Sequence, residues 1–155
     1  TNQGCDLVAV FDAETKLAIR YVNVGAAPAI EAPHMVKVSP DRKNWYVSFL
    51  GGTKFQKFDA STDNLVTSLD IGFGSWNTFS ISSDSKTAYI VDWSANGTIV
   101  IADLVTMTEK QRYQGSGLLL EPHGSCIKKS DTSLYITAQK GNFIYKIDVR
   151  KHRTC

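Results

Sequence analysis

The segment Val38-Ser39-Pro40-Asp41, followed by Trp45-Tyr46-Val47 and then Phe58-Asp59, decides the fold because related segments recur along the chain. A second copy consists of Ile81-Ser82-Ser83-Asp84, Ala88-Tyr89-Ile90 and Ala102-Asp103. A third consists of Lys128-Lys129-Ser130-Asp131, Leu134-Tyr135-Ile136 and Ile147-Asp148, and Val10-Phe11-Asp12 is the end of a partial copy. The chain is therefore a repeat protein.

The aspartates that close the copies set the length of the repeat. Asp12, Asp59, Asp103 and Asp148 are separated by 47, 44 and 45 residues. A period of this length is typical of the four-stranded antiparallel blade of a β-propeller. No long window keeps the apolar spacing of a helix, so the sequence predicts an all-β chain.

Alternating apolar runs separated by turn residues predict the strands of each blade. The Asn96-Gly97 pair lies between two such runs and is a strong hairpin signal. The predicted strands are 35–38, 45–50, 55–58 and 65–71 in one blade, 78–81, 88–93, 98–102 and 108–113 in the next, and 134–138 and 143–147 in the last.

These strands divide the 155 residues into about three and a half blades. We expect a partial blade at 1–25, full blades at 26–72 and 73–115, a second partial blade at 116–150 and a basic tail at 151–155. A propeller ring closes with about four to eight blades. Three explanations are open: the sequence is a segment of a longer chain, which we favour, a second copy supplies the missing blades, or a partner caps the open side.

The composition excludes two classes of partner. Hydrophobic residues make up 43% and charged residues 21% of the chain, and no apolar run is long enough to span a bilayer. The 17 basic and 15 acidic side chains are spread along the sequence, except for a basic cluster at 150–153. We therefore predict no transmembrane segment and no nucleic-acid partner.

Three cysteines, Cys5, Cys126 and Cys155, have no metal-binding spacing. Cys126 lies in a predicted inner strand, where we expect a buried thiol. Cys5 and Cys155 are candidates for pairing with cysteines outside this sequence, as in an oxidising compartment.

The strand signatures Trp45-Tyr46-Val47 and Leu134-Tyr135-Ile136-Thr137 resemble those of the YVTN-repeat (YncE-like) β-propellers, and the resemblance runs from about Asp6 to Asp148. It implies a ring of about seven blades and a periplasmic, cell-envelope or secreted location. More distantly, the chain is similar to the haem d1 propeller of nitrite reductases and the copper-binding propeller of nitrous oxide reductase. The glycine that usually follows Pro-Asp in the family is replaced by Arg42, Ser85 and Thr132.

Two Pro-His pairs, Pro33-His34 and Pro122-His123, precede inner strands. In a propeller blade, the loop before the inner strand and the turn between the second and third strands lie on one face, called the loop face below. The sequence predicts that this face gathers His34, Trp76, Asn77 and His123 from the loops and Trp93, Asn96, Lys140 and Asn142 from the turns. An exposed Trp76 or Trp93 there indicates a binding surface.

The leading hypothesis is a non-enzymatic binding or scaffold propeller that holds a protein, peptide or small ligand, or the remaining blades of the ring, on this face. The alternative is a redox propeller in which His34 and His123 bind copper or haem, because imidazole suits both. A hydrolase or lactonase ranks third, with Glu31, Asp92 and Glu121 as its available carboxylates. The imidazoles need not be equivalent, because seven residues separate His34 from Asp41 and eight separate His123 from Asp131.

Other recurring residues have structural explanations. The aspartates Asp12, Asp59, Asp103 and Asp148 are expected to accept backbone hydrogen bonds in the turns that follow them. The strand aromatics are expected to fill the space between blades, and these are Trp45, Tyr46, Tyr89, Tyr135 and Phe143.

Overall fold

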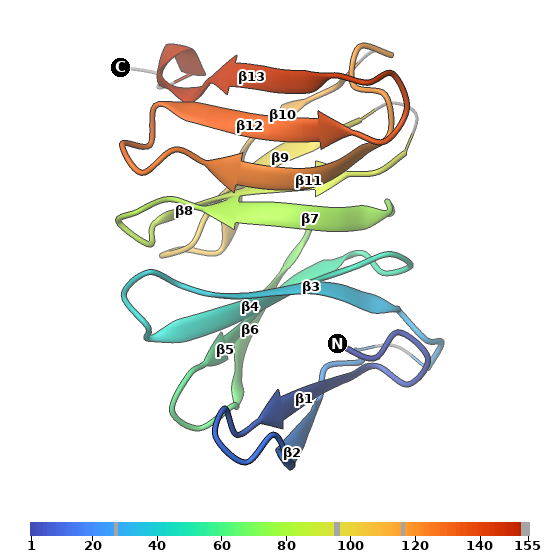
Figure 1. The fold of residues 1–155 in the computed structure, drawn as a ribbon, viewed down its shortest axis with the longest axis vertical. Helices are drawn as coiled ribbons and strands as arrows, with labels where there is room; N and C mark the ends of the chain where they lie inside the picture. The colour runs from blue at the N-terminus through green and yellow to red at the C-terminus, as the bar shows by residue number, and fades with distance from the viewer. Residues whose placement is uncertain (27, 95–96, 116, 153–155) are drawn as a thin grey trace.

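The computed structural model describes residues 1–26, 28–94, 97–115 and 117–152. Four antiparallel sheets follow one another along this part of the chain (Figure 1). The first sheet contains β1 (Leu7–Phe11) and β2 (Ala18–Asn23). The second contains β3 (Pro33–Val38), β4 (Asn44–Phe49), β5 (Lys54–Asp59) and β6 (Leu65–Asp70). The third contains β7 (Trp76–Ile81), β8 (Thr87–Asp92), β9 (Ile99–Asp103) and β10 (Thr108–Tyr113).

The fourth sheet contains β11 (Pro122–Ile127), β12 (Ser133–Ala138) and β13 (Ile144–Asp148), and a 3₁₀ turn (Val149–His152) follows it. Strands that are neighbours in the sequence are neighbours in each sheet, as a propeller blade requires. The inner strands β3, β7 and β11 run across the front of Figure 1, with β7 between the other two. The predicted all-β propeller architecture of about three and a half blades is confirmed.

Adjacent aromatic and aliphatic residues recur in the second strands, β4 and β8, because the second and third sheets are each buried on both faces. Successive side chains of a strand point to opposite faces. In β4, Trp45 and Val47 pack against the first sheet, whereas Tyr46 packs against the third. In β8, Ile90 packs toward the second sheet and Tyr89 toward the fourth. A run of large residues without polar alternation is therefore what a blade between two blades requires.

The alignment of the third copy was wrong by one residue. Backbone hydrogen bonds join Ser39 N to Asn44 O and Ser82 N to Thr87 O, and the equivalent bond in the fourth sheet joins Lys128 N to Ser133 O. Ser130 therefore takes the place of Asp41 and Asp84, and Asp131 takes that of the left-handed residues Arg42 and Ser85. Asp131 instead accepts hydrogen bonds from Ser83 N and Oγ in the neighbouring sheet.

The structural role of the recurring aspartates is confirmed. Asp59 Oδ1 accepts hydrogen bonds from Ser61 N (2.9 Å) and Thr62 N (2.9 Å), and Asp12 Oδ1 accepts from Glu14 N (3.0 Å) and Thr15 N (2.7 Å). Asp103 and Asp148 accept equivalent bonds from the residues that follow them. One carboxylate per blade thus closes the turn after the third strand.

The turn that follows Asp59 predicts that the folded protein loses stability in acid. The Ser61 hydroxyl and the backbone amides of Thr62 and Ser61 lower the pKa of Asp59 to about 2. A carboxyl whose pKa falls on folding stabilises the folded state above its unfolded pKa of about 3.9 and loses that contribution as the pH falls through the folded pKa. We expect urea unfolding midpoints of the wild type to fall between about pH 4 and pH 2. The Asp59→Asn variant should lose less over this range, and identical slopes would contradict the assignment.

The fourth sheet corrects three expectations. Phe143 is 58% exposed, Tyr135 is only partly buried, and Cys126 is exposed although β11 is an inner strand. Ser125, the neighbour of Cys126, points the other way and hydrogen-bonds Thr78 and Ser80 of β7. Cys126 therefore faces the side of the sheet that no described residue covers.

No helix among the described residues is both long enough and apolar enough to cross a membrane.

Candidate functional site

Each loop before an inner strand is hydrogen-bonded to the turn after the second strand, so the two kinds of segment expected to form the loop face adjoin each other. The three equivalent bonds are Leu50 N to Ala32 O (3.0 Å), Trp93 N to Ser75 O (2.8 Å) and Gln139 N to Glu121 O (2.9 Å). The same two segments are thus joined at the same edge of three successive sheets.

A β-bulge occurs at the second residue of every inner strand. The register shifts between Pro33 and Met35, between Trp76 and Thr78, and between Pro122 and Gly124. The bulged residues are His34, Asn77 and His123. A bulge redirects one side chain out of the regular ladder and is frequent next to functional sites. Three chemically capable side chains thus share one position in adjacent blades.

The two histidines are structurally equivalent, contrary to what their spacing to the aspartates indicated. Ala32 and Glu121, two residues before His34 and His123, both have left-handed φ angles, of 55° and 49°. The corrected alignment places Ser130 seven residues after His123, the same spacing as from His34 to Asp41. Each histidine thus follows a left-handed residue and a proline.

The fold brings the two imidazoles and the backbone of Asn77 together. The ring centroids of His34 and His123 are 6.3 Å apart, with an interplanar angle of 87°. Nδ1 of His34 lies 2.8 Å from the carbonyl oxygen of Asn77. Asn77 is 3% exposed, and its side-chain Oδ1 has no hydrogen-bond partner among the described residues. His34 is partly buried and His123 is exposed, so the group lies at the surface end of the inner strands.

The expectation of an exposed Trp76 was wrong. Trp76 is 1% exposed, belongs to the core between the second and third sheets, and donates from Nε1 to Gly72 O (2.9 Å). Its place next to the bulge turns it away from the loop face. Trp93 is partly buried and donates from Nε1 to Gln139 Oε1 (2.8 Å), which joins the third and fourth sheets.

The turn residues of the face are polar. Lys140 is exposed and forms an ion pair with Glu121, while Asn142 is exposed with a left-handed φ of 55°. Asn96 lies outside the described residues. The sequence did not single out Asp6, which is buried and accepts hydrogen bonds from Glu31 N and Ala32 N. Asp6 thereby holds the loop that presents His34.

The three carboxylates considered for hydrolysis are engaged in holding loops. Glu31 is buried and accepts a hydrogen bond from Ala26 N (2.6 Å). Asp92 Oδ1 accepts from Ser75 N (2.8 Å) and Ser94 N (3.1 Å), and Glu121 is paired with Lys140. Within the described ranges, no three His, Cys, Asp or Glu side chains come together around one point.

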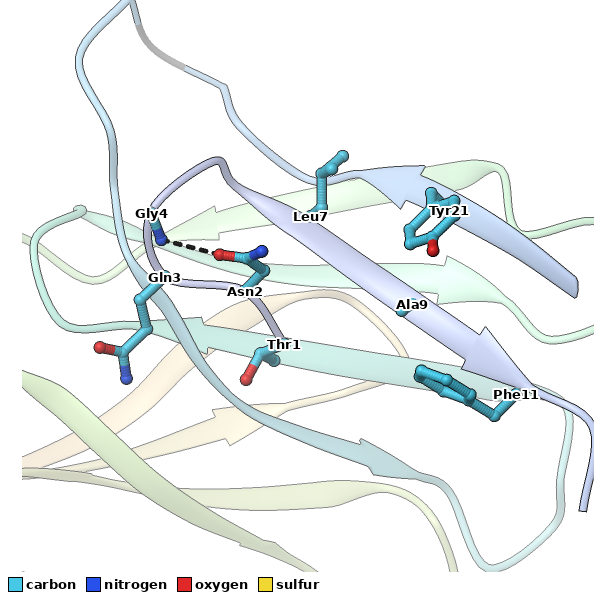
Figure 2. A pocket seen from close by; sticks show the side chains of 8 residues that line it. All are labelled: Thr1, Asn2, Gln3, Gly4, Leu7, Ala9, Phe11 and Tyr21. Carbon is cyan, nitrogen blue, oxygen red and sulfur yellow. Dashed lines mark hydrogen bonds between the residues drawn. The ribbon is translucent and has the colours of Figure 1, made fainter. Parts of the chain in front are cut away.

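A pocket of about 640 Å³ lies beside β1 (Figure 2), and Thr1, which lines it, donates a hydrogen bond to the backbone carbonyl of His34 (3.0 Å). Leu7, Ala9 and Phe11 of β1 and Tyr21 of β2 line one side, and the N-terminal residues 1–4 line the other. In the second and third sheets, the equivalent edges of β5 and β9 are covered by β4 and β8. Leu7, Ala9 and Phe11 alternate along β1 and Tyr21 is paired with Ala9, so the pocket lies over the face of the first sheet opposite to Val8, which packs toward the second sheet.

Comparison with known proteins supports the fold alone. No family model and no curated protein matches the chain. Among solved structures, Kuenenia stuttgartiensis hydrazine synthase, which contains a β-propeller, matches with a TM-score of 0.70 and 16% identity over 85% of this chain. The chain spans 37% of the length of that structure's chain. At this identity the likeness confirms the propeller architecture and carries no activity.

Proposed function

We propose that this chain is a non-enzymatic binding module whose ligand or partner occupies the loop face. The observation that carries the proposal is the bulge that recurs at His34, Asn77 and His123 and brings the two imidazoles, from the second and fourth sheets, to within 6.3 Å of each other between ring centroids. A repeat that only packed blades together would need no irregularity at this position. Bulges are retained where they direct a side chain toward a function.

The surroundings favour binding over catalysis. The three carboxylates near the face each hold a loop, through backbone amides or through Lys140. Trp93 and Lys140 flank the bulged residues and offer an aromatic edge and a cation to a protein, peptide or small ligand. The resemblance of the strand signatures to the YVTN-repeat propellers supports the proposal of a module of the periplasm, the cell envelope or the secreted fraction.

The proposal is tested by comparing two double variants produced in the natural source. His123→Ala with Lys140→Ala alters the loop face, and Lys43→Ala with Lys129→Ala alters exposed lysines in the turns at the opposite end of the inner strands. Native mass spectrometry of the purified proteins then reports what each retains. We expect the loop-face variant to retain its partner about tenfold less than the wild type, with the opposite-end variant unchanged. Equal retention by both variants would place the partner elsewhere, and a wild type that carries no partner would refute the function.

A further inference from the structure

The third strands of the four sheets can be compared position by position, because each ends at or directly before one of the recurring aspartates. The residue directly before that aspartate faces the preceding sheet. Phe58 and Ala102 occupy this position in the second and third sheets and are buried, and Ile147 of the fourth sheet packs against the third. In the first sheet the equivalent residue is Phe11, which is 61% exposed. Phe11 thus occupies a position that is covered in each described sheet that follows another sheet.

The opposite side of the repeat shows the same contrast. The residue four positions before the aspartate faces the following sheet, and Phe55 and Ile99 are buried there. In the fourth sheet the equivalent residue is Ile144, which is 72% exposed. Tyr46 and Tyr135 are also equivalent, but Tyr46 is buried and Tyr135 is only partly buried. The fourth sheet therefore presents a face that the second and third sheets bury.

These positions define two uncovered faces. The backward face of the first sheet consists of Leu7, Ala9, Phe11 and Tyr21. The forward face of the fourth sheet consists of Cys126, Tyr135, Ile144 and Lys146. The pocket of about 640 Å³ lies over the backward face, which is therefore hollow (Figure 2). Apolar side chains grouped on an exposed face mark an interaction surface.

A lysine indicates the polar chemistry of the missing contact. Lys57 lies two residues before its aspartate, and its Nζ donates a hydrogen bond to the carbonyl oxygen of Leu104 in the third sheet (2.9 Å). Lys146 has the same position in the fourth sheet and is exposed. Leu104 directly follows the aspartate of its sheet, and the equivalent residue of the first sheet is Ala13. The carbonyl oxygen of Ala13 accepts a bond from Lys16 and has a second lone pair for another donor.

We propose that the forward face of the fourth sheet packs against the backward face of the first sheet of a second copy of this chain. Forward-to-backward contacts already join the four sheets of one chain, so the new contact continues an interface that the fold contains three times. Of the explanations that the sequence left open, the paired faces support the second copy, because one kind of molecule carries both halves of the contact. Tyr135 and Ile144 then enter the hollow beside Phe11, and Lys146 donates to the carbonyl oxygen of Ala13.

Two such contacts close a ring of two chains. A contact between two different faces is head-to-tail, and it gives a closed ring when the rotation between copies completes a turn and an open filament when it does not. Two copies supply eight sheets, within the range of about four to eight blades at which propellers close. In the closed ring, both end faces of each chain are buried.

Sedimentation velocity and native mass spectrometry of the full chain at about 1, 10 and 100 µM test the contact over the micromolar range of dissociation constants. We expect the mass of two chains of 17.1 kDa each at the highest concentration. Iodoacetamide labelling of Cys126, which lies on the forward face, should slow as the dimer forms. A chain that stays monomeric throughout this range, or that forms a series of longer assemblies, overturns the proposal.

Matched variants locate the contact. Phe11→Lys alters the backward face and Ile144→Lys alters the forward face, and each places a lysine in both contacts of the ring. Each should therefore raise the dissociation constant of the dimer at least about tenfold. Phe73→Lys and Val105→Lys are the controls, because these two apolar residues are also exposed but lie in turns outside both faces, and their dimers should be unchanged. Equal weakening by all four variants, each shown to fold by circular dichroism, would contradict the assigned faces.

A mixture of the two face variants tests the head-to-tail arrangement. A dimer of one Phe11→Lys chain and one Ile144→Lys chain keeps one contact without a substitution, between the forward face of the first and the backward face of the second. With one variant labelled with ¹⁵N, native mass spectrometry should show this mixed dimer above its statistical proportion. A contact between two identical faces gives no such recovery, so a statistical mixture overturns the arrangement.

The dimer and the proposed binding function fail in different ways. The double variant His123→Ala with Lys140→Ala changes neither end face, so it should remain a dimer while it loses its ligand or partner. A wild type that dimerises but carries no other partner refutes the binding function and leaves the dimer. A monomeric wild type that carries a partner on the loop face refutes the dimer and leaves the binding function.

Discussion

Replacement of Trp76 by alanine is expected to lower the free energy of unfolding by about 3–5 kcal/mol, the range found for large aromatic residues removed from protein cores. The side chain is fully buried between the second and third sheets, with Ile71 and Phe79 in the same cluster. The substitution leaves a cavity and removes the hydrogen bond from Nε1 to Gly72 O. Arg112, whose guanidinium carbon lies 5.8 Å from the centroid of the indole ring, also loses this contact.

Trp93→Ala is the matched control, because Trp93 is a tryptophan of the same blade that is only partly buried. Its removal costs mainly the hydrogen bond to Gln139, a net contribution of about 1 kcal/mol, and some packing. Urea unfolding followed by far-ultraviolet circular dichroism measures both variants without depending on tryptophan fluorescence. If Trp76→Ala cost less than Trp93→Ala, the placement of Trp76 in the core would be wrong.

Gly97→Ala is expected to destabilise the protein by about 2–5 kcal/mol, from two sources that add. Gly97 has a φ of +55°, where a non-glycine residue is strained by about 1–2 kcal/mol. A Cβ atom there would also lie 2.4 Å from Leu119 Cβ and 2.9 Å from the Leu119 carbonyl oxygen. That backbone belongs to the loop before β11, so the clash forces the loop face apart and adds about 1–3 kcal/mol of overpacking.

Gly72→Ala separates the two sources. Gly72 also has a left-handed φ, of +74°, but a Cβ atom there meets nothing within 4 Å. We expect this control to cost about 1 kcal/mol, from backbone strain alone. Thermal and urea unfolding of the two variants should therefore differ by at least about 1 kcal/mol. Equal losses would show that the close approach of Gly97 to Leu119 does not occur in solution.

Local patterns were sufficient to predict most of the fold. Alternating apolar runs and turn residues located the strands to within a few residues, because hairpin pairing is a local property of the chain. The recurring aspartates were understood correctly because each bonds only to the two or three residues that follow it. The third copy was misaligned because Asp131 lies one position beyond the residue equivalent to Asp41. Asp131 accepts a hydrogen bond from Ser83 of the neighbouring sheet instead.

The candidate site was predicted only in part. The loop face and its histidines follow from the order of strands in a blade, which the repeat reveals. The bulges could not be predicted in this way. One extra residue on a strand is not visible in the sequence, where the residues at the bulges are Pro-His in two blades and Trp-Asn in the third. Trp76 was misplaced for the same reason, because a shift of one residue in register moves a side chain from one face of a strand to the other.

The sequence by itself determined that this protein is a repeat of four-stranded blades, which strands each blade contains and how its turns close, because these features depend on contacts within about fifty residues. The tertiary structure alone decided that the ring centroids of His34 and His123 lie 6.3 Å apart. These histidines come from the second and fourth sheets, on either side of Asn77 of the third. It also decided that Trp76 is core and Cys126 is exposed. The distance between blades and the face to which a bulged side chain turns depend on how sheets pack, and no local pattern records that packing.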